Sequence, residues 1–563
     1  MMNSAWGRFL GLSASFILLL GILLGGCALP AATTPLPTSL PSPVQAPLPS
    51  PIFQAKTGAT LQSDPYVVSP PKLDRKPSRY TIVARLDPDQ ALITGREHVQ
   101  FTNTSRYSWP KVYFHLYPNA FSEESKAPYL GDPKREFPNG FNPGWLKIKP
   151  DPNAEILPDK STVLTYRLSQ PLAPGESAEV SLEFEAKVPE AKNRYSYYDG
   201  VFTIGNWYPI LAVFDENGWN LDPYYALGDP FYSETALYEV QLTLPEGYLL
   251  AHTGVITSQQ PAEAGWVTYQ IVTGLVRDFG FAASARYLTK TAMAGDTLVE
   301  SLYLPEDERG GQTALDTAVR AITYFNKLYG QYPYRKFAVA ETSFPGGMEY
   351  PNLIFIGKTI YAERNVTEYF VAHEVAHQWW YALVGNNQIA EPWLDEGLTQ
   401  YSAQRYMMDQ LGPEESKRLF TRGTGTPLAP DPQKEAGLMR RSVTSFDSWG
   451  AYQEVIYDRG AQALHRLKDK IGQDRFDVLM QEFFRRYEYR VARVDDFLKV
   501  VEEVAGDEAL RFLEPYAQES DSSRWQWLAW PPVKPPGAWH VTPPLVTTAF
   551  EVNKGYESQL RDR

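Results

Sequence analysis

The sequence predicts a multidomain α+β protein, in which an all-β N-terminal domain is followed by a mainly helical domain. Its 563 residues exceed the usual size of one domain and suggest two or three. Between about residues 80 and 305, short β-favouring runs alternate with turn residues. After residue 305 apolar residues recur at helical spacing instead. We therefore expect a β-rich domain over residues 53–305 and a second domain over residues 306–519.

The first half contains four strand candidates, each of which alternates or clusters residues that favour an extended backbone. They span residues 80–86, 111–116, 178–184 and 238–244. An all-β domain follows from these segments, although the sequence does not reveal how they pair.

The second half begins with a helix and continues with two strands. The helix should end near Gly330, and its apolar residues have helical spacing: Leu315, Val319, Ile322, Phe325 and Leu328. Residues 337–342 and 353–356 favour strands on either side of a turn at Gly346 and Gly347. From about residue 365 to residue 518 the pattern is mainly helical.

The N-terminus has the composition of a targeting segment. Arg8 precedes a short apolar stretch over residues 9–24. The run L-G-G-C that ends at Cys27 resembles a bacterial lipobox, in which cleavage exposes a cysteine that carries a diacylglycerol. We expect a signal peptide over residues 1–26 and lipidation of Cys27, with an ordinary secretory signal or a retained membrane helix as alternatives.

Two further segments lack the periodicity of a packed domain. Residues 27–52 are rich in Pro, Ser and Thr, which favours an extended spacer. Residues 520–563 are rich in Trp and Pro, which predicts an irregular tail. The lipid and the spacer together predict an extracytoplasmic protein of the bacterial cell envelope, anchored to the membrane.

Charge and cysteine content exclude several classes of function. The formal net charge of −13 argues against nucleic acid as a partner, because phosphate binding favours a positive protein surface. The single cysteine excludes a disulfide framework and a thiolate metal site.

The strongest chemical signal is the run H-E-V-A-H from His373 to His377 in a predicted helix. Residues four apart share one helical face, so both imidazoles can bind one ion. Glu374 lies about 100° around the helix from His373, where a base acting on a zinc-bound water must be. Asn365 and Glu368 are spaced like a capping pair at the helix start.

Glu396 is the candidate third ligand. A metzincin would have a third histidine six residues after His377, but that residue is Leu383. Glu396 lies near a predicted helix start, with Pro392 in the first turn. Two histidines and one glutamate leave a fourth tetrahedral position for water, as in a catalytic zinc site. The alternative is a pair of core histidines, which would require separate buried partners for all three side chains.

The spacing H-E-x-x-H, eighteen residues and then Glu resembles the membrane alanyl aminopeptidase family, whose catalytic domain is thermolysin-like. Residues 332–336 resemble the Y-P-x-x-K segment of that family, and residues 346–349 resemble its G-x-M-E exopeptidase motif. Residues 457–461 resemble its Y-[DE]-K-G motif, and residues 276–282 resemble the end of its β-rich domain. The resemblance covers about residues 80–518.

Carried over by position, the resemblance implies a zinc site and two catalytic residues. His373, His377 and Glu396 would bind one zinc ion per chain. Glu374 would act as the general base that activates the zinc-bound water. Tyr457 would donate a hydrogen bond to the oxyanion. Tyr452 is an alternative for this last role.

The same resemblance implies a substrate site. Glu349 would bind the free α-ammonium group of a peptide, unless it is only an exposed carboxylate in a turn. Gly346, Gly347 and Met348 would bind substrate through backbone groups or would only shape the turn. Tyr350 departs from the family pattern, which has asparagine there, and no second residue for the ammonium group is evident from the sequence.

Three functions are compatible with these observations. The leading expectation is a zinc-dependent aminopeptidase that releases N-terminal residues from oligopeptides. We expect the large C-terminal helical domain of many family members to be missing, which makes an endopeptidase with an open cleft the enzymatic alternative. A non-catalytic lipoprotein that binds peptides is the third possibility, and the presence of Glu374 argues against it.

Overall fold

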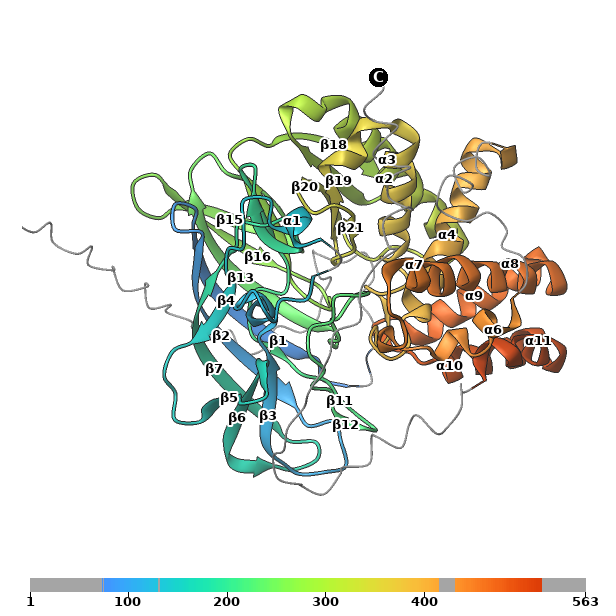
Figure 1. Ribbon diagram of the computed structural model, residues 1–563, viewed down its shortest axis with the longest axis horizontal. Helices are drawn as coiled ribbons and strands as arrows, with labels where there is room; N and C mark the ends of the chain where they lie inside the picture. The colour runs from blue at the N-terminus through green and yellow to red at the C-terminus, as the bar shows by residue number, and fades with distance from the viewer. Residues whose placement is uncertain (1–72, 74, 130–131, 415–430, 519–563) are drawn as a thin grey trace, which may run out of the picture. The chain divides into compact units, whose positions relative to one another are not determined.

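The computed structural model describes residue 73 and residues 75–129, 132–414 and 431–518 (Figure 1). The predicted signal peptide, Cys27, the spacer over residues 27–52 and the tail over residues 520–563 lie outside the described residues. Among the helices that are described, none is both long enough and apolar enough to cross a bilayer.

The predicted all-β region is confirmed and contains three main sheets. The largest has the strand order β15-β16-β13-β1-β2-β7-β4. Its strands are β1 (Ser78–Asp87), β2 (Leu92–Thr102), β4 (Trp145–Ile148), β7 (Ser177–Lys187), β13 (Ala236–Pro245), β15 (Val255–Pro261) and β16 (Trp266–Val272). A second sheet joins β10 (Ile210–Leu211), β3 (Trp109–His115), β6 (Lys160–Leu172) and β5 (Ala154–Leu157). The third joins β14 (Leu249–His252), β17 (Phe281–Ser284), β9 (Val201–Ile204) and β8 (Tyr195–Tyr198). A short hairpin consists of β11 (Phe214–Asp215) and β12 (Gly218–Trp219).

The large sheet buries one face, as the alternation of its strands predicts. Buried and partly exposed residues alternate along β2 and β13. The neighbouring strands β1 and β13 run parallel, so that Tyr80 lies beside Tyr238. The two rings stack with their centroids 4.8 Å apart, and both are buried. An aromatic core therefore joins strands that are about 150 residues apart in the sequence.

A five-stranded sheet has the order β18-β19-β20-β22-β21 and carries part of the candidate site. Its strands are β18 (Leu288–Ala294), β19 (Thr297–Tyr303), β20 (Lys336–Thr342), β21 (Gly347–Met348) and β22 (Leu353–Gly357). All residues of β20 and β22 are buried, as expected for strands covered on both faces. Because β19 pairs with β20, this sheet extends across the domain boundary predicted at residue 305. The edge strand β21 brings the G-G-M-E segment to the site.

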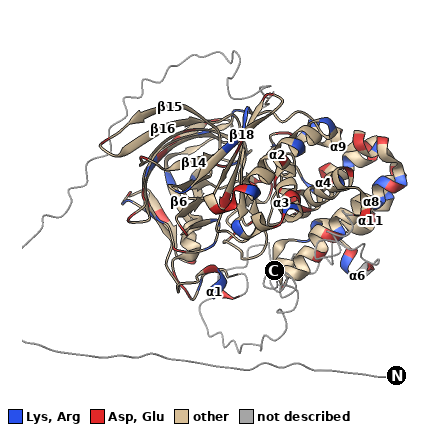
Figure 2. Ribbon diagram, turned by 90° about the horizontal axis from the view of Figure 1, so that it is seen from above, with Lys and Arg blue, Asp and Glu red and all other residues tan. Residues whose placement is uncertain are grey.

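The remaining described elements are mainly helical. Besides α1 (Pro133–Glu136) and several short 3-10 helices, they are α2 (Glu308–Leu328), α3 (Arg364–Ala376), α4 (Trp393–Leu411), α6 (Pro432–Glu435), α7 (Trp449–Tyr452), the π-helix η6 (Gln453–Arg459), α8 (Gly460–Ile471), α9 (Gln473–Tyr487), α10 (Val494–Ala505) and α11 (Asp507–Ala517). Two short strands, β23 (Val384–Gly385) and β24 (Arg490–Val491), pair between them. Figure 2 shows acidic and basic residues interspersed on α8, α9 and α11. This mixture of signs is typical of solvated helix faces.

The helix that carries both histidines begins without the predicted capping pair. Its N-cap residue is Glu363, and no side chain caps it. Glu368 instead accepts hydrogen bonds from Arg320 and Arg364, each at 3.1 Å. The prediction for Asn365 and Glu368 was wrong because a partly buried ion-pair network takes the carboxylate away from the helix start.

Glu341, in β20, provides a test of the buried sheet. Its side chain is fully buried, and Oε2 accepts a hydrogen bond from the Leu304 N–H at 2.7 Å. Burial raises the pKa of Glu341 from 4.5 to about 8. Asp307 adds to this rise, and the hydrogen bond from Leu304 opposes it. The folded protein therefore retains a proton that the unfolded chain releases, and stability should fall as the pH rises from about 5 to about 8.

The variant Glu341→Gln keeps the acceptor and removes the titration. Its unfolding free energy, measured by urea denaturation at several pH values, should depend less on pH than that of the wild type. The difference in slope should approach ~1.4 kcal/mol per pH unit. Glu239→Gln, at a more exposed position in β13, is the control. Equal slopes in the wild type and Glu341→Gln would show that Glu341 titrates normally.

Candidate metal centre

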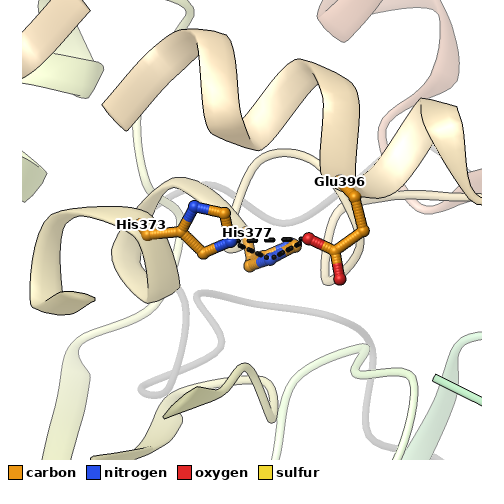
Figure 3. Close-up of side chains that lie close together, drawn as sticks. All are labelled: His373, His377 and Glu396. Atoms are coloured by element: carbon orange, nitrogen blue, oxygen red, sulfur yellow. Dashed lines mark hydrogen bonds and ion pairs between the residues drawn. The ribbon is translucent and has the colours of Figure 1, made fainter. Parts of the chain in front are cut away.

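Two imidazoles, one from helix α3 and one from the residue that follows it, converge on the same point (Figure 3). His373 lies in the last turn, and His377 is the C-cap residue. The residues are 7% and 1% exposed, and their Nε2 atoms lie 3.2 Å apart. The expectation that residues four apart converge is confirmed, because one helical face brings both rings together.

Glu396 completes the group from the first turn of α4 (Figure 3). Its Oε2 atom lies 3.4 Å from His373 Nε2 and 3.3 Å from His377 Nε2. Ligand atoms at zinc distances of about 2.0–2.2 Å lie about 3.3–3.6 Å apart at the corners of a tetrahedron. The three observed separations, including the 3.2 Å between the imidazoles, fit one zinc ion. The donor set of two imidazoles and one carboxylate also suits zinc.

Asp395 orients one of the ligands. Its Oδ1 atom lies 2.7 Å from His377 Nδ1, and both side chains are buried. The negative charge beside Nδ1 favours a proton on that atom, which leaves the Nε2 lone pair for a metal. The Trp380 carbonyl oxygen lies 3.1 Å from the same Nδ1 atom. Sequence reasoning did not assign this role to Asp395, although its position beside Glu396 was a usable signal.

Glu374 lies beside the three ligand atoms and packs on the edge strand β21. It is 4% exposed, and a Cβ atom on Gly347 would come within 1.9 Å of its Oε1 atom. Gly347 is therefore required for the close approach of strand and carboxylate. Burial raises the pKa of Glu374 to about 8, with nearby acidic groups adding to the shift and His377 opposing it. A bound divalent cation would act in the lowering direction.

Tyr457 approaches the centre from the π-helix η6. Its hydroxyl donates a hydrogen bond to Glu396 Oε1, and its ring lies 6.0 Å from that of His373. Burial and the Glu396 charge raise the pKa of the Tyr457 phenol well above 10, so it stays protonated and able to donate. The Tyr452 hydroxyl is buried and has no hydrogen-bond partner among the described residues. Short π-helical segments occur often at functional sites.

Glu349 follows β21 and is buried, with 3% exposure. Its Oε1 atom accepts a hydrogen bond from Gln388 Nε2 at 3.3 Å, and the same amide donates to Asp395 Oδ2 at 2.5 Å. Gln388 therefore connects Glu349 to the carboxylate that orients His377. The interpretation of Glu349 as an exposed turn residue is wrong, because the surrounding side chains enclose it.

Tyr350, which departs from the family pattern, makes its hydrogen bond to Asn206 and not to Glu349. It is fully buried, and its hydroxyl donates to Asn206 Oδ1 at 2.7 Å. Gly205 and Gly280 leave room for the ring, since a Cβ atom on Gly205 would lie 1.8 Å from the hydroxyl oxygen. Tyr350 thus anchors the end of the edge strand to the β-rich region and leaves Glu349 in place.

The structure adds Asp229, which sequence reasoning missed. Asp229 is 6% exposed and pairs with Arg194 at 2.7 Å. One of its carboxylate oxygens lies within 4.8 Å of ligand atoms of Asp395 and Glu396. Burial, partly offset by Arg194 and increased by Glu396, raises its pKa to about 7. It lies in a long irregular segment before β13, without a motif that could have identified it.

The centre has an excess of negative charge. Glu349, Asp229, Asp395, Glu374 and Glu396 are all at most 6% exposed. Burial raises the pKa of Glu349 well above 4.5, and the neighbouring Asp229 carboxylate adds to the shift. Such a cluster is stabilised when cations bind within it. One metal ion and one ammonium group are cations that this geometry can take.

Known proteins resemble both the sequence and the fold. Residues 313–516 match the Peptidase family M1 domain. The chain is 28% identical over 210 residues to leucine aminopeptidase 2-1 of Meyerozyma guilliermondii. This match covers 35% of this chain and 32% of that protein. It is 28% identical over 183 residues to human aminopeptidase B, and this match covers 31% of this chain and 28% of that protein. The chain therefore spans about a third or less of the length of these relatives.

The M1 zinc metallopeptidase from Deinococcus radiodurans shares the fold. Its crystal structure superposes with a TM-score of 0.52 at 18% identity, covering 82% of this chain and 97% of that one. The all-β region followed by a helical region is thus a known arrangement. The resemblance to the membrane alanyl aminopeptidase family is thus confirmed by the match of residues 313–516 to the Peptidase family M1 domain.

Proposed function

We propose that this protein is a zinc-dependent aminopeptidase that removes N-terminal residues from oligopeptides. The observation that carries the proposal is the set of separations of 3.2–3.4 Å among the His373, His377 and Glu396 donor atoms, which fits one tetrahedral zinc ion. The family match over residues 313–516 supports the same chemistry. The relatives named aminopeptidases support the class of substrate.

The proposed reaction assigns one task to each side chain. A bound zinc ion would supply a Lewis acid that polarises the scissile carbonyl and acidifies a water molecule. Glu374 accepts the proton of the attacking water and later delivers a proton to the leaving amine. Tyr457 donates a hydrogen bond to the oxygen on which negative charge develops. Asp395 keeps His377 in the tautomer that can bind metal.

The buried carboxylates beside this centre support an exopeptidase. Glu349, held by Gln388, would accept hydrogen bonds from the α-ammonium group of the first residue. Asp229, held by Arg194, is the acidic group from the β-rich region that would serve as a second acceptor. The edge strand β21 offers the backbone groups of Gly347 and Met348 to an extended peptide.

The endopeptidase alternative rested partly on Tyr350, whose hydroxyl bonds to Asn206 and not to Glu349. It also rested on an open cleft, which does not by itself exclude selection of the amino terminus. Experiment can distinguish the two activities, because only an aminopeptidase needs a charged amino group on its substrate.

Glu349→Ala should discriminate between them. We expect kcat/KM for free-amino aminoacyl amides to fall roughly tenfold to a hundredfold, as for loss of a buried hydrogen bond to a charged group. Activity on the acetylated amides should be low in the wild type and should change little in the variant. The assay compares both substrate forms with the wild type, Glu349→Ala and the control Glu363→Ala, whose side chain is exposed. Equal losses on free and acetylated substrates, or a wild-type preference for the acetylated form, would contradict amino-terminal selection.

A further inference from the structure

The proposed function leaves the adjacent residues Arg277 and Asp278 unexplained. They lie between β16 and β17, and each is 1% exposed. No carboxylate within 4.0 Å of the Arg277 guanidinium occurs among the described side chains. The group instead donates to backbone carbonyl oxygens, which is an unusual environment for a fully buried cation.

These carbonyl groups come from segments that are far apart in the sequence. Arg277 Nε donates to Tyr381 O at 2.7 Å, and Nη1 donates to Ser233 O at 2.9 Å. Nη2 donates to Arg490 O at 2.9 Å and to Leu383 O at 3.5 Å. One side chain thus joins the β-rich region to the segment after the metal helix and to β24.

The fit around the guanidinium is tight. A Cβ atom on Gly385 would lie 2.0 Å from Arg277 Cζ, so that any other residue there would displace the guanidinium. The backbone of β23 and the planar fork of Arg277 are therefore in direct contact.

Asp278 also contacts Tyr381, through the side chain of Tyr381 rather than its backbone. The Tyr381 hydroxyl donates to Asp278 Oδ2 at 2.8 Å. Tyr381 has a φ of +139°, which residues with a side chain rarely adopt, and it is only 2% exposed. Such a conformation persists where surrounding contacts over-determine it, and here Arg277 and Asp278 supply contacts at both ends of the residue.

Tyr381, the residue that Arg277 and Asp278 contact, lies close to the metal ligand His377. Tyr381 follows Trp380, whose carbonyl oxygen lies 3.1 Å from His377 Nδ1. It precedes Ala382, whose N–H donates to His377 O at 3.0 Å. Both peptide neighbours of Tyr381 therefore contact His377, and the backbone direction at Tyr381 fixes where they lie.

We propose that Arg277 and Asp278 are positioning residues that clamp Tyr381 and thereby set the orientation of the His377 imidazole. The β-rich region would then contribute to the reaction by holding the metal ligand, in addition to covering the site. This inference rests on the metal centre of the proposed function. The alternative is a cross-link that stabilises the fold without influence on the metal.

Tyr381→Phe tests the clamp, because it removes one hydroxyl and keeps the ring and the backbone carbonyl. Asp278→Asn and Arg277→Lys weaken the other contacts. Zinc affinity is measured by competition with a chromogenic chelator, and kcat and KM on a free-amino aminoacyl amide are measured separately. We expect zinc to bind roughly tenfold more weakly in Tyr381→Phe and Asp278→Asn, as for other residues that orient metal ligands, with kcat reduced and KM unchanged.

Ile82→Ala is the matched control, since Ile82 is fully buried in β1 and its loss should lower only thermal stability. Zinc affinity and kcat equal to wild type in Tyr381→Phe and Asp278→Asn would overturn the clamp while leaving the zinc site intact. Weaker zinc binding in Ile82→Ala would likewise assign the effect to general destabilisation. A wild type that binds no zinc would refute the proposed function and the clamp together. If Arg277→Lys does not fold, the two milder variants decide.

Discussion

Replacing Glu374 with glutamine should remove most of the turnover while zinc remains bound. The substitution keeps the size of the side chain, so it still fits against Gly347, where the space is too small for a Cβ atom. An amide cannot accept the proton of the attacking water. The loss of a general base typically lowers the rate by about 10²–10⁴-fold, and we expect kcat to fall within or beyond this range.

Zinc should be retained because Glu374 contributes none of the three donor atoms that converge. Zinc content and kcat are measured on the same preparation of Glu374→Gln. The control is Glu368→Gln, which alters a buried carboxylate on the same helix that pairs with Arg320. Loss of zinc in Glu374→Gln would make Glu374 a ligand rather than a base. Full activity would favour the non-catalytic, peptide-binding alternative.

Tyr457→Phe is expected to have the second largest effect, a decrease in kcat of roughly 10²–10³-fold. The phenol stays protonated because burial and the Glu396 charge raise its pKa well above 10. It can therefore donate to an oxygen whose charge appears only during the reaction. An interaction made only in the transition state lowers kcat and kcat/KM together and leaves KM nearly unchanged.

Tyr452→Phe is the matched comparison for Tyr457→Phe. Tyr452 is also buried, and its ring lies 5.7 Å from that of Tyr457. Its hydroxyl has no hydrogen bond to Glu396, in contrast to that of Tyr457. We expect Tyr452→Phe to keep most of the activity. A larger loss in Tyr452→Phe than in Tyr457→Phe would transfer the oxyanion role to Tyr452.

Local patterns in the sequence were sufficient for the fold class and for the convergence of the two histidines. Strand alternation predicted β1 and β13, and helical spacing predicted α2. His373 and His377 could be paired because one helix turn fixes their relation. Glu396 required the family spacing in addition, since nothing in the local pattern brings α4 beside α3.

The features that depend on distant contacts could not be predicted. Asp229 reaches the site from an irregular segment, and its partner Arg194 is 35 residues earlier in the sequence. Arg277 was noticed only as part of a family-like run, because its carbonyl partners are up to 213 residues away. The predicted capping pair did not form because the helix begins one residue before Asn365, after the N-cap residue Glu363, and because two arginine side chains bind the Glu368 carboxylate. Tertiary contacts of this kind override local preference.

The central claim is that His373, His377 and Glu396 hold one zinc ion. The direct measurement is the metal content per chain of the purified wild type and of Glu396→Ala after dialysis against zinc-free buffer. We expect one zinc per wild-type chain and a substoichiometric amount in Glu396→Ala, because two imidazoles alone leave the site incomplete. A wild-type chain without stoichiometric zinc, or a Glu396→Ala variant that keeps a full equivalent, would contradict the account.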